Sequence, residues 1–210
     1  MGLREYFSEY DGAMFTLPEI AGKYEGRKVA VCGDGACIWD DLEKLGCKSN
    51  VGRGKVHKEG WDFLTVNKLG EVFPGNIEHW YSNEGKLLQN FVNARRHEYR
   101  KEFSGPNHTH SCNRGAKWHW PWGGHGTSGL GAILTAIALG YDEIVVCGIP
   151  LDDGPHNGEP YWRGTNFRRE APDTEKGGAN HPWRKAIQLA FDGKVRSMSG
   201  RSREWIVRYS

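Results

Sequence analysis

Short apolar runs alternate with amphipathic segments along the chain, and this alternation predicts strands followed by helices. Residues 29–32 form an apolar run, a Gly-Asp-Gly turn follows, and Ile38, Leu42 and Leu45 then recur at helical spacing. Strand, tight turn and helix in this order open a Rossmann-like unit.

Further elements follow the same pattern. "WDFLTVN" predicts a strand that ends at Asn67, "IEHWYSN" predicts one that ends at Asn83, and "EGKLLQNFVNARRHEY" predicts an amphipathic helix. A helix is predicted over Ser128–Leu139 with Gly140 as its left-handed cap, followed by a buried parallel strand over Glu143–Cys147. "PWRKAIQLAFDG" predicts a last helix, and the tail after it predicts one or two short edge strands.

Two long segments lack any apolar period. Residues 101–126, which are rich in Trp and His, and residues 150–181 are predicted to be irregular active-site loops, the first of them a lid. "SNVGRGKVHKEG" is predicted to be a loop, and residues 1–26 to be a leader that packs on the domain edge. The prediction is one nucleotide-binding α/β domain over residues 1–210, with a mainly parallel sheet flanked by helices.

Composition narrows the classes of partner. The chain has 210 residues, 28 basic and 26 acidic, so its net charge of +2 creates no global field for nucleic acid or membrane, and an anionic ligand must be held locally. We expect no membrane span, because no apolar run is long enough, and no signal peptide. Five cysteines suggest reduced thiols and a soluble, cytoplasmic protein. Association into an oligomer stays open.

Polar residues are expected at the carboxyl ends of the strands, where open parallel sheets bind ligands. The turn after the first strand could let a phosphate or ribose approach bare backbone, or it could serve only as a tight turn. The residues expected at this edge are Gly33, Asp34, Gly35, Asn67 and Asn83.

The predicted helix at Ser128 begins with residues that suit an anion. Thr127 and Ser128 supply hydroxyls beside free N–H groups and the positive end of the helix dipole, although a plain N-cap is the alternative. Gly129 permits close approach of a ligand. His181, at the entrance of the last helix, has the pKa of a general base or is simply a cap.

Other candidates are more ambiguous. Asp152 and Asp153 follow a strand, where they could hold Mg²⁺ against a diphosphate or form a turn, and Arg163 could bind phosphate or face solvent. An aromatic loop could stack a base or sugar face, form a hydrophobic lid or contact another subunit. Its residues are Trp118, Trp120 and Trp122.

Taken in order, five segments resemble a known family. "VAVCGDGACIWDDLEKL", "FLTVNK", "WYSN", "GTSGLGAILTAIALGYDEIVVCGI" and "NHPWRKAIQLAF" look like the motifs of the small bacterial sialyltransferases that decorate lipooligosaccharide, over residues 29–191. Related domains occur in motility-associated factors that modify flagellin and in hydroxymethylpterin pyrophosphokinases. The resemblance implies a Rossmann-like, GT-A-like fold that uses a CMP-sugar.

The resemblance also implies roles for individual residues. The family's Thr-Ser-Gly, which holds the donor's phosphate and carboxylate, falls on Thr127, Ser128 and Gly129, and its histidine base falls on His181. A tyrosine that stabilises the leaving phosphate falls on Tyr161. The family's contacts to nucleotide and sugar fall on Gly33, Asp34, Gly35, Asn67 and Asn83.

Three functions remain from these residues. The first is an inverting glycosyltransferase that takes a CMP- or UDP-linked sugar, needs no cofactor, and glycosylates a glycan, a small molecule or a modified nucleic acid base. The second is a Mg²⁺-dependent nucleotide pyrophosphokinase or phosphotransferase built on Asp34, Asp152 and Asp153. The third is a nucleic-acid binding module, in which the tryptophans stack bases.

Overall fold

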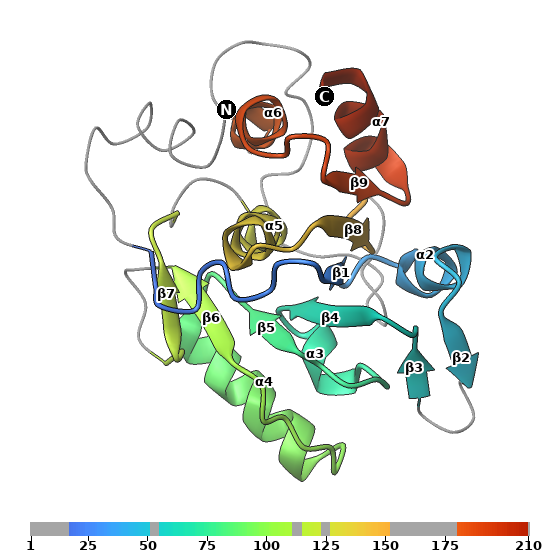
Figure 1. The fold of residues 1–210 in the computed structure, drawn as a ribbon. Coiled ribbons are helices and arrows are strands. Elements are labelled where there is room, and N and C mark those ends of the chain that lie inside the picture. The colour runs from blue at the N-terminus through green and yellow to red at the C-terminus, as the bar shows by residue number, and fades with distance from the viewer. Residues whose placement is uncertain (1–16, 51–54, 111–114, 123–126, 152–179, 210) are drawn as a thin grey trace.

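A seven-stranded parallel sheet forms the centre of the molecule (Figure 1). The computed structural model describes residues 17–50, 55–110, 115–122, 127–151 and 180–209. Within them the strand order is β7-β6-β5-β4-β1-β8-β9, and every pair in this sheet is parallel. The strands are β1 (Lys28–Cys32), β4 (Trp61–Val66), β5 (His79–Tyr81), β6 (Asn107–His110), β7 (Trp118–Trp120), β8 (Glu143–Cys147) and β9 (Val195–Ser197).

Helices cover both faces of this sheet, which confirms the predicted α/β class. Alternate residues of β1 point to opposite faces, so Val29 packs in one apolar cluster and Ala30 in the other. One cluster contains side chains of α5 (Ser128–Leu139), α6 (Asn180–Leu189) and α7 (Gly200–Tyr209). The other contains side chains of α2 (Ile38–Lys44), α3 (Leu69–Val72) and α4 (Gly85–His97).

The strand order reverses beside β1. The chain runs outward from β1 through β4, β5, β6 and β7, and α5 then carries it back to β8 on the other side of β1. Reversal points of this kind are where open α/β sheets bind ligands, beyond the carboxyl ends of the strands. The predicted bounds of α5 and β8 are confirmed, and Gly140 caps α5 with a left-handed φ of 97°.

Two predictions about irregular segments are wrong. Residues 107–110 and 118–120 are strands of the sheet rather than parts of a lid, and their buried positions include His108, Thr109 and Trp120, which do not form an apolar run. The predicted loop after α2 contains an antiparallel hairpin of β2 (Lys48–Asn50) and β3 (Lys55–His57). The tail contributes one edge strand, β9, as predicted, and then the helix α7, which was not predicted.

A chain of hydrogen bonds links the sheet to the residue that follows α5. Trp120 Nε1 lies 3.1 Å from His108 Nδ1, His108 Nε2 lies 2.9 Å from His79 Nδ1, and His79 Nε2 lies 3.0 Å from the Tyr141 hydroxyl. The Tyr141 hydroxyl donates to Asp62 Oδ2 at 2.8 Å. Because an indole N–H can only donate, every bond runs from Trp120 toward Asp62, and both imidazoles are neutral.

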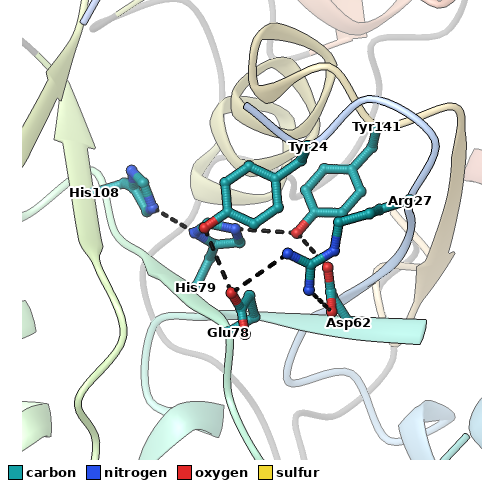
Figure 2. A network of polar contacts seen from close by, with 7 residues as sticks. All are labelled: Tyr24, Arg27, Asp62, Glu78, His79, His108 and Tyr141. Atoms are coloured by element: carbon teal, nitrogen blue, oxygen red, sulfur yellow. Dashed lines mark hydrogen bonds and ion pairs between the residues drawn. The ribbon is translucent and has the colours of Figure 1, made fainter. Parts of the chain in front are cut away.

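Two side chains of the segment before β1, Tyr24 and Arg27, contact residues of this network (Figure 2). Arg27 donates to Asp62 Oδ1 at 2.6 Å, and the Tyr24 hydroxyl lies 3.4 Å from Glu78 Oε1. The Tyr24 ring packs edge-on against His79 with 4.6 Å between ring centroids. These contacts hold Tyr24 and Arg27 on the domain, while residues 1–16 of the predicted leader lie outside the described residues. Burial lowers the pKa of His79 to about 3, and it lowers the pKa of His108 well below its usual value.

The two neutral imidazoles should make stability depend on pH. An unfolded imidazole binds a proton below about pH 6.5, whereas the buried ones do not, so the unfolded state takes up more protons as the pH falls. The free energy of unfolding should be constant above neutral pH. Between about pH 6.5 and 5 it should fall by up to about 1.4 kcal/mol per pH unit for each imidazole.

Urea unfolding at several pH values measures this slope. His79→Gln should reduce it by about half, because one of the two imidazoles is removed. His97→Gln, at an exposed position in the last turn of α4, is the matched control and should leave the slope as it is. An equal slope in His79→Gln and the parent would contradict this assignment.

Candidate functional site

The carboxyl edge of the sheet gathers several of the sequence candidates. The Gly33–Gly35 turn follows β1, Asn67 follows β4, Asn83 lies two residues after β5, and α5 begins beside them. Parallel pairing of β1 with β4, and of β4 with β5, brings these strand ends to one edge. Asn67 itself adopts a left-handed φ of 51°, a conformation that asparagine tolerates better than most residues.

The end of β5 is fixed to the first turn of α5. The Asn83 backbone N–H donates to Ser128 Oγ at 3.2 Å, and the Tyr81 hydroxyl donates to Asn83 Oδ1 at 2.9 Å. The buried Tyr81 ring lies where a side chain on Gly131 would be, so the absence of a Cβ lets helix and strand approach. Asn83 and Ser128, separated by 45 residues, therefore meet as the sequence prediction requires.

Thr127 joins α5 to α6. Its hydroxyl oxygen accepts the Leu130 N–H, which makes Thr127 the N-cap, and it also accepts Trp183 Nε1–H, each at 3.3 Å. Trp183 is fully buried and belongs to the first turns of α6. His181 precedes it by two residues in the same helix, so its backbone lies near the start of α5, while its side chain lies outside the described residues.

The glycine turn after β1 faces the loop after β8. The N–H groups of Gly33 and Gly35 donate to the carbonyls of Cys147 and Gly148, both at 2.8 Å. A Cβ on Gly35 would lie only 2.8 Å from the Gly148 carbonyl oxygen, and one on Gly33 only 2.6 Å from it. These two N–H groups are therefore already used within the protein.

Ile149 lies between the glycine turn and α5. A Cβ on Gly129 would approach Ile149 Cγ2 to 3.0 Å, and one on Gly33 would collide with Ile149 Cγ1. The predicted glycine positions thus come together around one side chain of the loop after β8. Asp34, which lies between the two turn glycines, is half-buried.

Asp41 is a residue of this edge that the sequence argument missed. It is fully buried in α2, and its Oδ2 accepts the Gly148 N–H at 2.9 Å and the Ser199 hydroxyl at 2.7 Å. It holds the start of the loop after β8 against α2 and the residue that precedes α7. The available signal was its spacing, since Asp41 shares the buried face of α2 with Ile38 and Leu42.

The tryptophans do not form an exposed stacking surface. Trp120 is 0% and Trp122 is 3% exposed, and their rings stack on each other with centroids 4.8 Å apart. Trp122 Nε1 donates to the Gly131 carbonyl of α5 at 3.1 Å. The expectation that Trp120 and Trp122 stack a ligand is therefore wrong, because both rings complete the core. Trp118 is half-buried, with Lys117 Nζ 5.5 Å from its ring centroid.

Four candidates lie outside the described residues, namely Asp152, Asp153, Tyr161 and Arg163. Within the described residues, no group of three or more His, Cys, Asp or Glu side chains could hold a metal ion. No helix in that same part of the chain is long and apolar enough to cross a membrane.

The fold and this edge define a Rossmann-like α/β protein with the first turn of α5 at the centre of its candidate site. No family model matches the chain, and no curated protein matches it. Among solved structures, the chain is similar to the monofunctional alpha-2,3-sialyltransferase Cst-I from Campylobacter jejuni. The TM-score is 0.50 at 16% sequence identity, and the match covers 90% of this chain and 79% of that chain. At this identity the match shows the fold.

The double role of Thr127 is testable. Thr127→Val keeps the shape but removes the oxygen that caps α5 and accepts Trp183 Nε1–H, so the free energy of unfolding should fall by about 2–4 kcal/mol. Thr127→Ser keeps that oxygen and should lose much less. Urea unfolding of the two variants measures the difference, and equal stabilities would show that the hydroxyl holds neither helix.

Proposed function

We propose that this protein is a nucleotide-sugar-dependent glycosyltransferase whose donor, a CMP-linked sugar, binds at the first turn of α5. The observation that carries the proposal is the hydrogen bonding of two hydroxyls. Thr127 accepts two N–H groups and Ser128 accepts the Asn83 N–H, and within the described residues no acceptor is recorded for either hydroxyl proton. Both hydroxyls can therefore donate to an anion.

The helix itself favours the same ligand. The first turn of α5 contains no acidic residue, so no carboxylate of that turn neutralises the positive end of the helix dipole. A donor phosphate and the sugar carboxylate of a CMP-sialic acid are anions of the kind that such a helix end binds. The similar fold of a sialyltransferase supports this choice of donor.

The reaction assigned to the site is an inverting substitution. His181 takes the proton of an acceptor hydroxyl, the hydroxyl oxygen bonds to the anomeric carbon, and the bond from that carbon to the CMP phosphate breaks. Thr127 and Ser128 stabilise the negative charge that develops on the leaving phosphate, together with Tyr161. The place of His181 in the first turn of α6, which Trp183 ties to Thr127, supports this role.

This reaction needs no metal, because hydroxyls and a helix end supply the anion stabilisation. A Mg²⁺-dependent phosphotransferase would depend instead on Asp34, Asp152 and Asp153, of which the last two lie outside the described residues. A role in binding nucleic acid has lost its main support, since Trp120 and Trp122 are buried.

Nucleotide binding tests the donor. CMP without metal should raise the melting temperature more than UDP, GDP or ATP does, because binding to the native state alone stabilises it. Ser128→Ala should reduce the CMP shift, whereas Ser104→Ala, at an exposed position before β6, should preserve it. A shift that required Mg²⁺ and ATP would favour phosphotransfer, and no shift with any nucleotide would contradict both enzymes.

Turnover tests the base. His181→Asn should keep the CMP-induced thermal shift but lose about 100-fold or more of the rate at which CMP is released from CMP-N-acetylneuraminate with a panel of sugar acceptors. If deprotonation by His181 limits the rate, the parent rate should also fall as the pH drops below the imidazole pKa. Unchanged CMP release in His181→Asn would remove this histidine as the base.

A further inference from the structure

A cavity lies at the amino ends of the strands, opposite to the first turn of α5. It has a volume of about 810 Å³, and its lining comes from β3, the start of β4, the loop between α3 and β5, and the loop after α4. All of these segments meet at the amino ends of the strands. The donor site proposed above does not include any residue of this cavity.

One wall of the cavity contains a buried arginine. Arg95 is 3% exposed, and four of its five N–H donors bond to the backbone carbonyls of Gly70, Phe73, Gly75 and Glu102 at 2.8–3.3 Å. These partners are neutral, and no ion pair to Arg95 occurs within the described residues. A buried guanidinium that lacks a counter-ion is costly, and an anion in the cavity would compensate it.

A second cation lies beside it. Lys101 Nζ is 3.5 Å from the same Phe73 carbonyl oxygen that Arg95 binds, and 3.3 Å from the Val72 carbonyl oxygen. Burial and the charge of Arg95 lower the pKa of Lys101. Two cations that share the Phe73 carbonyl, with no acidic partner in the described part of the chain, form the kind of paired donor set that binds a phosphate group.

The carboxylates of the cavity wall already have partners elsewhere. Asp62 is bound by Arg27 and Tyr141, and Glu102 is 3.6 Å from Arg96. Glu78 is 3.9 Å from Arg27 but remains 39% exposed, so it can still accept hydrogen bonds from a ligand.

The rest of the lining contains both basic and neutral residues. Lys55 and His57 belong to it, as do the half-buried Trp61 and the exposed Asn76. An aromatic face beside a carboxylate and an amide suits the apolar face and the hydroxyls of a sugar ring.

We propose that this cavity binds a sugar phosphate, with the phosphate on Arg95 and Lys101 and the sugar hydroxyls on Glu78 and Asn76. The ligand class follows from two features of one lining: the cations Arg95 and Lys101 have no acidic partner in the described part of the chain, and Glu78, Asn76 and Trp61 belong to the same lining. A ligand in this cavity would not contact a ligand in the donor site, because the two sites lie at opposite ends of the strands.

Calorimetric titration with glucose 6-phosphate, inorganic phosphate and glucose tests the proposal. Glucose 6-phosphate should bind more tightly than inorganic phosphate, and glucose alone should bind most weakly. Lys101→Gln should weaken glucose 6-phosphate binding by about tenfold or more, since it removes a charged donor. Lys86→Gln, at an exposed position in the first turn of α4, keeps the cavity intact and should leave binding unchanged.

Three results would overturn the proposal: no saturable binding of glucose 6-phosphate, equal binding by Lys101→Gln and the parent, or equal affinity for inorganic phosphate and glucose 6-phosphate. The CMP-induced thermal shift of Lys101→Gln separates this test from the donor site. Lys101→Gln should retain that shift whether or not the cavity binds a sugar phosphate.

Discussion

The docking of α5 on the sheet is the contact on which both ends of the structure depend. At its start, Gly131 lets the helix approach Tyr81, and the Thr127 hydroxyl accepts Trp183. At its end, Gly22 and Tyr24 of the leading segment donate to the carbonyls of Ala138 and Leu139, and Tyr141 enters the buried hydrogen-bond chain. One apolar helix thus positions the candidate site at one edge of the sheet and closes the core at the other.

Polar groups have two different roles in this structure. The hydrogen bonds that run from Trp120, the last residue of β7, to Asp62, near the start of β4, satisfy each buried group in turn, so the network specifies one arrangement. At the carboxyl edge, Thr127 and Ser128 accept N–H groups and keep a proton to donate. A network in which every polar group has a partner stabilises the fold. An anionic ligand requires the opposite, namely hydroxyl donors that are held in fixed positions and have no acceptor within the described part of the protein.

Much of the central sheet could be predicted from the sequence. Apolar runs fixed β1, β4 and β8, and the bounds of α5 followed from its glycines and apolar residues. The strands β6 and β7 could not be predicted, because their buried positions include His108, Thr109 and Trp120, which form no apolar run, and because His108 finds its partners on other strands. The role of Asp41 could not be predicted either, because its partners Gly148 and Ser199 lie more than 100 residues away in the sequence.

The use of the N–H groups of Gly33 and Gly35 constrains how a nucleotide could bind. In the familiar dinucleotide fold, the turn after the first strand offers its backbone to the phosphates. Here those two groups bond to the loop after β8, which Asp41 holds from the other side. The proposed function therefore assigns the anion to the α5 side, to the hydroxyls of Thr127 and Ser128. The glycine turn contributes by placing Ile149 against Gly129, which sets the position of that helix end.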